Sequence, residues 1–326
     1  MSLMFTFIPF IFLFAFIIIL CSRGNKNKIK INLNVSSEYK KMAYDLIMKT
    51  PEVAEARKKY KTKQFLIILF ILALLAAFIF FFMRSPIIAF VLFILFAVSL
   101  FFLSRKDDSK LFDEIVAKLL KKYDDSFEYK HNEGILSQVY REAKFGGYDR
   151  YHSDDLIKGK INNNSFELAE VHTERRSTDS EGHTTYVTTF HGTFIKVDLE
   201  KSYDGMLNIV NNRIKLFSRD QYVTIDNEAF EKIYDVFTDD KIKALRLLTP
   251  DVTSKMIDIY NETGLYCEIK IVGKFLYMRL FTGALFPFSF SNPEKESKLI
   301  GESVAIVDLA FKVIKNFVNE LERFDV

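Results

Sequence analysis

The sequence predicts an α+β protein in which N-terminal transmembrane helices are followed by a cytosolic domain with a largely antiparallel sheet and a long C-terminal helix. Three observations predict it. Uncharged apolar runs fill residues 4–21, 65–83 and 87–103. Runs rich in β-branched and aromatic residues follow between 156 and 199, and an apolar seam at helical spacing ends the chain.

The first apolar run predicts a transmembrane helix over residues 1–22. Its positive charges, beginning with Arg23 and Lys26, follow the run, whereas a cleaved signal peptide carries them before it. We therefore expect a retained span with its N-terminus outside. A lipoprotein anchor at Cys21 is the alternative, although Leu20 is bulky where lipoprotein processing prefers a small residue.

Residues 23–63 predict a basic cytoplasmic linker with an amphipathic helix. Residues 39–60 have helical character, and Thr50-Pro51-Glu52 marks a fresh helix start. We expect this helix to be solvated, with a partner groove as the alternative. The linker ends in a basic cluster: Arg57, Lys58, Lys59, Lys61 and Lys63. Cytoplasmic loops are enriched in Lys and Arg, and such a cluster is attracted to anionic lipid headgroups.

Residues 64–104 predict a transmembrane helical hairpin. Only Arg84-Ser85-Pro86 separates its two runs, and each is near the roughly 20 residues that cross a bilayer core. Pro86 suits the first turn of the second helix, because its missing N–H would be unpaired there. A buried hairpin in a soluble core is the alternative. A hairpin returns the chain to its starting side, so residues 105–326 are expected in the cytoplasm, anchored to the cytoplasmic (inner) membrane by a multi-pass segment.

Composition and motifs exclude several function classes. The chain has 12 Gly, and it contains no phosphate-binding loop, dinucleotide fingerprint, zinc-protease helix or nucleophile elbow. Its two cysteines, Cys21 and Cys267, lie far apart in the sequence, so no disulfide framework is implied. The domain lacks a strong basic excess, which argues against nucleic acid as a partner. We expect no cofactor.

Residues 105–143 predict two helices at the start of the domain. Leu111, Ile115 and Leu119 recur at helical spacing among charges, which predicts an amphipathic stalk. A second, short helix is predicted over residues 136–143.

The pattern then changes to period two and predicts antiparallel strands. Residues 156–161 and 166–175 flank an Asn-rich turn, and residues 184–199 form a long β-branched run. A two-residue turn at Glu181-Gly182 would place residues whose numbers sum to 363 opposite each other. In this register Glu167 faces Lys196 and Leu168 faces Ile195, so opposite charges and apolar side chains are paired, which stabilises neighbouring strands.

One face of this predicted pair carries candidate metal ligands. Glu170, His172 and Glu174 alternate along one strand, and the same register places His191 opposite His172. Imidazole and carboxylate ligands suit zinc or manganese. Polar residues are ordinary on the solvent side of an antiparallel ribbon, so a solvated or pH-sensitive surface is the alternative.

Further strands and helices are predicted beyond residue 204. Strands are expected over residues 205–217 and 221–225, residues 230–237 are ambiguous, and residues 241–247 are helical. Thr249-Pro250 predicts the start of a helix that Gly264 ends. Residues 266–272 and 275–281 predict a hairpin across Gly273-Lys274, with Cys267 as a small core or edge residue.

A long helix is predicted from Asn292 to about Phe324. Its apolar seam steps by four and three, which indicates packing on the domain's own sheet, with a helix–helix contact between protomers as the alternative. Asp308, Lys312 and Lys315 exclude a fourth span. The seam comprises Ile300, Val304, Val307, Phe311, Ile314, Val318 and Leu321.

A set of short motifs distributed over the domain carries a family resemblance. They are Tyr148, Tyr151, Asp154-Asp155, Ile157, Gly159, Glu170-Val171-His172, Phe190-His191-Gly192-Thr193-Phe194, Phe230-Glu231, Val236 and Leu247-Leu248-Thr249-Pro250. From residue 39 onward the chain resembles the bacterial membrane proteins of unknown function called domain of unknown function 3137. The resemblance implies an N-terminal amphipathic helix, a transmembrane hairpin and a cytosolic α+β domain, and it supplies no activity. The first span is additional, and His191 stands where Lys is expected, which weakens the metal hypothesis.

Two function classes remain. The first is a membrane-anchored protein whose cytosolic domain is a binding, scaffolding or sensing module without enzymatic activity. The alternative is a membrane-tethered, metal-dependent hydrolase that uses the His/Glu face. Convergence of the histidines with Glu170 or Glu174 in a concave pocket would favour the hydrolase. Expected partners are the bilayer, anionic headgroups, and a protein partner or second copy at the C-terminal helix.

Overall fold

The computed structural model describes residues 37–49, 51–82, 109–212, 222–286 and 293–323, with single positions at 85, 88, 91, 94 and 95. The predicted span over residues 1–22, the linker up to residue 36 and most of the second run of the predicted hairpin lie outside the described residues. When only the described residues are counted, no helix is identified as long and apolar enough to cross a membrane.

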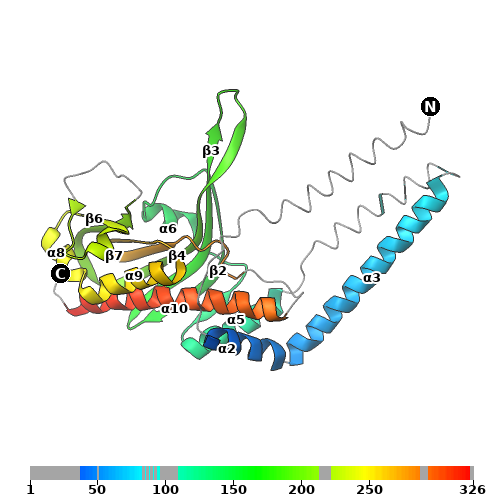
Figure 1. Cartoon of the computed structure of the whole chain (residues 1–326), viewed down its shortest axis with the longest axis horizontal. Coiled ribbons are helices and arrows are strands. Elements are labelled where there is room, and N and C mark those ends of the chain that lie inside the picture. The colour runs from blue at the N-terminus through cyan, green and yellow to red at the C-terminus, as the bar shows by residue number, and fades with distance from the viewer. Residues whose placement is uncertain are drawn as a thin grey trace.

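Two helices precede the domain. Helix α2 (Ser37–Lys49) lies along the C-terminal helix, and its Ala43 is fully buried. The expectation of a solvated helix was therefore wrong, because α2 packs on the chain's own domain. Helix α3 (Pro51–Phe82) begins at the predicted Pro51 and continues without interruption from the basic cluster into the apolar run. Figure 1 shows α3 pointing away from the domain.

The domain is α+β, as predicted, and its sheet is antiparallel throughout the described pairings. The strand order is β1-β2-β3-β4-β6-β5, and β7 pairs with β4. The elements in chain order are α5 (Ser109–Tyr123), β1 (Glu128–Lys130), α6 (Ser137–Glu142), β2 (Arg150–Ile161), β3 (Asn164–Thr178), β4 (Thr184–Asn211), β5 (Tyr222–Val223), α7 (Glu228–Glu231), β6 (Tyr234–Thr238), α8 (Lys241–Leu247), α9 (Pro250–Thr263), β7 (Cys267–Leu280) and α10 (Pro293–Arg323).

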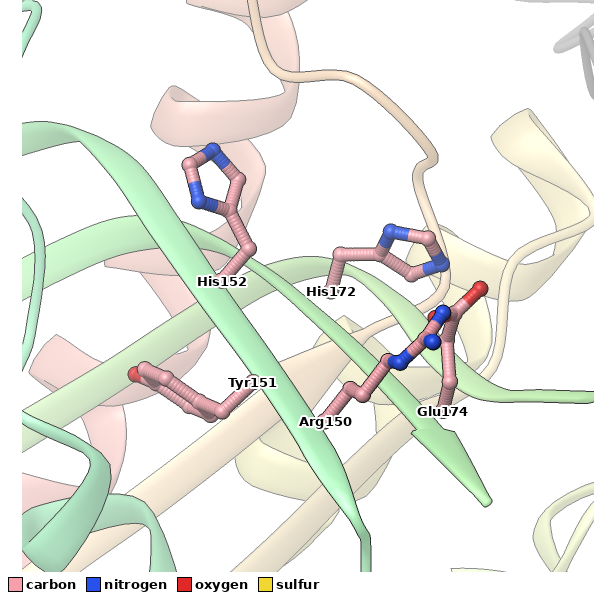
Figure 2. A pocket seen from close by; sticks show the side chains of 5 residues that line it. All are labelled: Arg150, Tyr151, His152, His172 and Glu174. Carbon is pink, nitrogen blue, oxygen red and sulfur yellow. The ribbon is translucent and has the colours of Figure 1, made fainter. Parts of the chain in front are cut away.

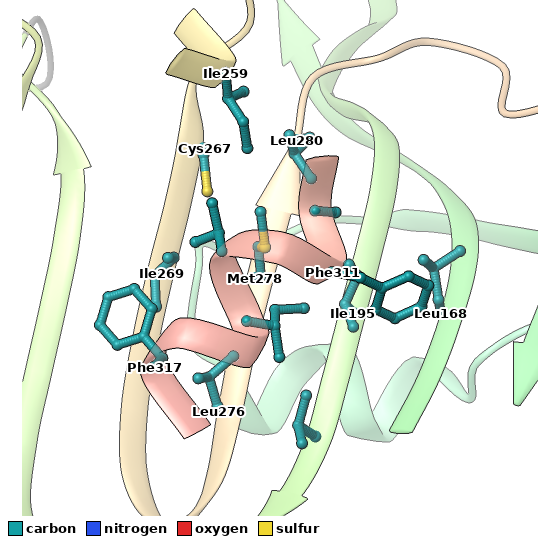
Figure 3. Close-up of a cluster of buried hydrophobic side chains, with 14 of the residues drawn as sticks. Leu168, Ile195, Ile259, Cys267, Ile269, Leu276, Met278, Leu280, Phe311 and Phe317 are labelled. Carbon is teal, nitrogen blue, oxygen red and sulfur yellow. The ribbon is translucent and has the colours of Figure 1, made fainter. Parts of the chain in front are cut away.

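Strand β7 turns back on itself at Gly273, whose φ of 57° suits a residue without Cβ. Figure 3 shows the arm with Cys267 and Ile269 beside the arm with Leu276 and Met278, as the predicted hairpin requires. One arm pairs with residues 206–209 of β4 and the other with residues 193–198. Cys267 is fully buried in the core, as expected.

The pairing of β3 with β4 confirms the predicted register, including Leu168 opposite Ile195 and His172 opposite His191. The predicted turn was wrong. Thr178 pairs with Thr184, so residues 179–183 form a longer loop, with the Asp179 amide donating to the His183 carbonyl. The register shifts by one residue between Thr173 and Glu174. This shift compensates for the longer loop, so the predicted pairs are correct from Ser165 to Thr173.

The two faces of the sheet carry separate cores. The main core lies between the sheet and α10, and the seam predicted for α10 is buried in it. Figure 3 shows Phe311 and Phe317 of α10 against β7. Helix α5 contributes Ile115, Leu119 and Leu120 to this core, so the prediction of a stalk was wrong. A smaller core, around Tyr140 of α6, covers part of the opposite face.

Local signals predicted the ends of several elements correctly. The Thr249 side chain accepts from the Val252 amide, Pro250 starts α9, and Gly264 ends it with φ 69°. The ambiguous residues 230–237 span the end of α7 and most of β6. Of the strand expected over residues 205–217, the part up to Asn211 belongs to β4, and residues 213–220 lie outside the described residues.

Candidate functional site

Three neighbouring strands place three histidines in one row. His152 on β2 lies opposite His172 on β3, and His172 lies opposite His191 on β4. In the adjacent row, Asp154 lies opposite Glu170. Residues that face each other across strands, or that are two apart along one strand, point to the same side of a sheet. The histidine row and the Asp154–Glu170 row therefore lie on the same face of the sheet as Phe166 and Leu168 of β3, which pack in the main core with α10.

A β-bulge in β2 brings a further carboxylate to this place. The register shifts between Asp154 and Ile157, and Asp155 adopts a φ of 55°, a conformation in which Asp is enriched. Its side chain is 4% exposed. The Tyr129 hydroxyl donates to Asp155 Oδ1 at 2.5 Å, and His131 Nδ1 lies 2.6 Å from the same oxygen. These contacts hold Asp155 inside the protein.

Three carboxylates and three histidines meet here in pairs. Oxygens of Asp154, Asp155 and Glu170 lie within 4.8 Å of one another. Each carboxylate has its own imidazole: His131 contacts Asp155, His152 Nε2 lies 3.4 Å from Asp154 Oδ2, and His191 Nε2 lies 2.8 Å from Glu170 Oε1. We call these six residues the His/carboxylate cluster. Of the chain's five histidines, only His172 and His183 stand outside it.

The surroundings of Asp154 disfavour negative charge on this side chain. The pKa of Asp154 is raised to about 6, first by burial and then by the charges of Glu170 and Asp155, while His152 acts in the opposite direction. The hydrogen bond to Asp155 is the main cause that raises the pKa of His131. Burial raises the pKa of Asp113, which approaches His131 from α5. The environment of Asp154 therefore disfavours its anionic form.

The four predicted site residues separate into two pairs. Glu170 and His191 contact each other, as described above. The rings of His172 and His191 lie 4.6 Å apart, but His172 Nε2 is 3.1 Å from Thr188 Oγ1. Glu174 pairs with Arg150 at 3.6 Å, and burial together with His191 lowers the pKa of His172.

His172 and Glu174 line a shallow cavity of about 360 Å³ together with Arg150, Tyr151 and His152. Figure 2 shows Arg150 and Glu174 meeting beside His172. Neither His191 nor Glu170 lines this cavity. The four predicted residues therefore do not share one concave site, and the geometry does not favour the hydrolase alternative.

Sequence reasoning missed four members of the cluster, namely His131, His152, Asp154 and Asp155. The available signal was the adjacent pair Asp154-Asp155, which comes just before the strand predicted over residues 156–161 and lies inside the observed β2, because Asp is depleted in strands. His131 carried no signal, because only the pairing of β1 with β2 brings it near Asp155. Among the described residues, Asp154, Asp155 and Glu170 are the group whose oxygens lie close enough together to hold one metal ion.

A backbone bridge connects the cluster to α10. Glu170 Oε2 accepts from the Leu285 amide at 2.6 Å, and the Ser303 hydroxyl of α10 donates to the Leu285 carbonyl. Leu285 is fully buried. One residue of the segment that follows β7 is thus held by the cluster on one side and by α10 on the other.

The predicted basic cluster lies in the first half of α3. Lys58, Lys59 and Lys61 are exposed, and Lys59 pairs with Glu55 at 3.0 Å. Arg57 and Lys63 belong to the same helix, and their side chains lie outside the described part of the structure.

Part of the chain is similar to a protein family of unknown function. No curated protein matches it. The crystal structure of the mycobacterial trehalose monomycolate transport factor A is similar, with 10% identity, 63% of this chain and 95% of that chain covered, and a TM-score of 0.32, a likeness too distant to carry an argument. The family model described as "Protein of unknown function (DUF3137)" matches residues 188–319, which extend from β4 into α10. This match supports the family resemblance that the sequence motifs carry.

Proposed function

We propose that this protein is a membrane-anchored sensing or binding module. The apolar half of α3 and the residues up to 104 form a hairpin in the cytoplasmic membrane, and the α+β domain works on the cytoplasmic side. The observation that carries this proposal is the continuity of α3, in which exposed lysines and an exposed, uncharged apolar surface follow each other in one helix.

The apolar half of α3 needs a non-aqueous environment. Six large apolar side chains in two turns are about half exposed or more: Phe65 63%, Leu66 59%, Ile68 53%, Leu69 49%, Phe70 52% and Leu72 56%. Removing a side chain of this size from water is worth about 1.5–3 kcal/mol. Contiguous exposed apolar surface of this kind marks a membrane or protein contact. The following uncharged run, residues 87–103, supplies the second helix of the proposed hairpin.

The basic end of α3 supports a cytoplasmic domain. Lys58, Lys59 and Lys61 are exposed between the domain and the apolar half. Lysines at this place favour the cytoplasmic side and contact anionic headgroups. Since the proposed hairpin returns the chain to its starting side, the domain after residue 104 shares this compartment.

Cysteine labelling tests the anchoring and its direction. In a chain with Cys21→Ser and Cys267→Ala, single cysteines at Lys58→Cys, Ser180→Cys and Ser85→Cys are treated with a membrane-impermeant maleimide in intact cells. Ser85, in the turn of the hairpin, is expected to react, whereas the other two react only after permeabilisation. Labelling of Lys58→Cys or Ser180→Cys in intact cells would refute this topology. Failure of the chain to float with membranes would refute the anchoring itself.

The path from the cluster to the membrane supports a sensing role. Glu170 accepts a hydrogen bond from the Leu285 amide, and the Leu285 carbonyl accepts one from Ser303 of α10. Helix α10 in turn packs against α2. Helix α2 ends at Lys49, and α3 begins at Pro51. A change in charge at Glu170 therefore alters how α10 packs against α2. The domain then has two packing arrangements, and a ligand that binds one of them more tightly shifts the population toward it.

A distance measurement tests this coupling. Spin labels at Lys41→Cys on α2 and Lys255→Cys on α9, both exposed, report how α2 sits on the domain. Glu170→Gln is expected to shift or broaden the distance distribution, because it removes one charge next to the Leu285 amide. The matched control is Glu174→Gln, whose carboxylate contacts Arg150 instead. An unchanged distribution in Glu170→Gln, or an equal change in both variants, would contradict the sensing role.

A protein partner or a second copy of this chain is also proposed to bind the domain at α10. The apolar seam of α10 is buried within this chain. A contact between copies would therefore use another surface, such as the exposed side of α10 that carries Lys298 and Lys312. Light scattering of the detergent-solubilised chain at increasing concentration, with and without Lys312→Glu, measures such an association.

A further inference from the structure

Within the described part of the chain, permanently charged cationic side chains do not balance the charge of the His/carboxylate cluster. Among the described residues, the side chains that contact Asp154, Asp155 and Glu170 are the Tyr129 phenol and three imidazoles. The nearby Arg150 pairs with Glu174 instead. Three carboxylates whose oxygens lie within 4.8 Å of one another repel, so protons on the imidazoles or carboxylates, or a bound cation, must compensate.

The spacing of the polar atoms fits ligands that share a metal ion. Ligand atoms bound about 2.1 Å from one transition metal lie about 3.0 Å (octahedral) to 3.4 Å (tetrahedral) from each other. His191 Nε2 and Glu170 Oε1 are 2.8 Å apart, and His152 Nε2 and Asp154 Oδ2 are 3.4 Å apart. The carboxylate oxygens that link these two pairs lie within 4.8 Å of one another. His191 and His152 therefore flank the carboxylate oxygens that lie close enough together to share one ion.

The local backbone positions these groups independently of one another. His131 follows β1, Asp154 and Asp155 lie at the bulge of β2, and His191 lies on β4.

Asp154 Oδ1 is buried and has no hydrogen-bond partner in the described part of the chain. A buried carboxylate oxygen without a partner is costly, and a metal ion would satisfy it.

We propose that Asp154, Asp155 and Glu170 bind a divalent first-row transition-metal ion of the Zn²⁺ or Mn²⁺ type, with His191 and His152, which contact Glu170 and Asp154, completing the site. Mixed imidazole and carboxylate ligands favour such ions over Mg²⁺ and Ca²⁺, which prefer oxygen alone. His131 orients Asp155 from outside the ligand set. This inference rests on the function proposed above, because it names the ligand that the domain senses.

Metal binding at Glu170 would be transmitted by the Leu285 bridge. Oε1 faces His191 and the proposed ion, while Oε2 holds the Leu285 amide. An ion that draws Oε1 toward it moves Oε2 as well, because both oxygens belong to one rigid carboxylate. The displacement reaches α10 through the bond between Leu285 and Ser303.

Metal binding is measured on the detergent-solubilised full chain, purified through a tag without histidine and stripped with chelator. Titration calorimetry with Zn²⁺, Mn²⁺ and Mg²⁺ separately is expected to show one Zn²⁺ or Mn²⁺ per chain and Mg²⁺ binding at least tenfold weaker. Glu170→Gln, Asp154→Asn and His191→Ala are each expected to weaken binding by about 10–100-fold. Circular dichroism on heating checks that each variant is folded.

His183→Ala is the matched control. His183 lies near two carboxylates, Asp179 and Glu181, at the exposed end of the β3–β4 ribbon, outside the cluster. Unchanged binding in this variant supports the assignment. Absence of stoichiometric binding, equal affinity for Mg²⁺, or full affinity in folded Glu170→Gln and Asp154→Asn would overturn it. Labelling of Ser85→Cys and the response of the α2–α9 distance to Glu170→Gln need no metal, so they test the proposed function separately.

Discussion

Two buried polar groups lie on opposite faces of the same sheet and differ in their balance of charge. On the α6 side, Arg279 Nε lies 2.5 Å from Glu268 Oε2 across the fold of β7, with side chains 10% and 1% exposed. Phe145 and Phe281 lie over the guanidinium, with ring centres 4.6 and 5.1 Å from Cζ. On the α10 side, the His/carboxylate cluster gathers three carboxylates and three imidazoles.

The comparison distinguishes a structural ion pair from a candidate functional site. Each group has one buried carboxylate oxygen without a partner among the described residues, Glu268 Oε1 and Asp154 Oδ1, so this feature alone does not separate them. The Glu268–Arg279 pair is neutral within itself. The cluster is anionic unless it binds protons or a cation, and such imbalance is typical of groups that act on a ligand.

The largest effect is expected for Arg279→Met. This change leaves Glu268 buried without its counter-ion, which costs about 3–5 kcal/mol of unfolding free energy. Urea unfolding followed by circular dichroism measures the loss. The double variant Glu268→Leu/Arg279→Met is expected to recover most of it, because neither charge then remains buried. A loss below about 1 kcal/mol in the single variant would mean that water or Lys270 compensates Glu268, and the contrast between the two faces would fail.

Asp154→Asn is expected to stabilise the protein at neutral pH. The folded pKa of Asp154, about 6, lies above its ordinary value of 3.8, so the group favours folding below pH 4 and loses this contribution as pH rises through 6. Asn removes that loss. With the side chain 31% exposed, we expect about 1–2 kcal/mol at pH 7.5 and none at pH 4. Urea unfolding at both pH values, without metal, measures it; destabilisation at pH 7.5 would show that the cluster is already neutralised.

Ser303→Ala is expected to have the smallest effect, about 0.5–1.5 kcal/mol, because it removes one hydrogen bond to the Leu285 carbonyl. This variant separates the cluster from α10 without altering the charge of the cluster. Hydrogen exchange at residues 281–286 should become faster, while Ser254→Ala on the exposed side of α9 should leave it unchanged. Equal exchange in wild type and Ser303→Ala would show that the bridge does not restrain this segment.

Much of the fold followed from local patterns. The register of β3 with β4 could be predicted from the alternation of Phe166, Leu168 and their partners, because a slip by one residue would turn these side chains out of the core. The capping residues of α9 acted through their own neighbours in the chain. The contact between Glu170 and His191 was predictable for the same reason, since the register brings their strands together.

The sequence alone determined the division into an apolar N-terminal part and an α+β domain, the buried seam of α10 and two of the six residues of the cluster, because periodicity and composition encode burial directly. The other four residues depended on tertiary structure. The bulge at Asp155, the position of His131 beside β2 and the bridge at Leu285 each join segments distant in sequence. Such contacts depend on how sheet, loop and helix pack against one another, which no local pattern of residues specifies.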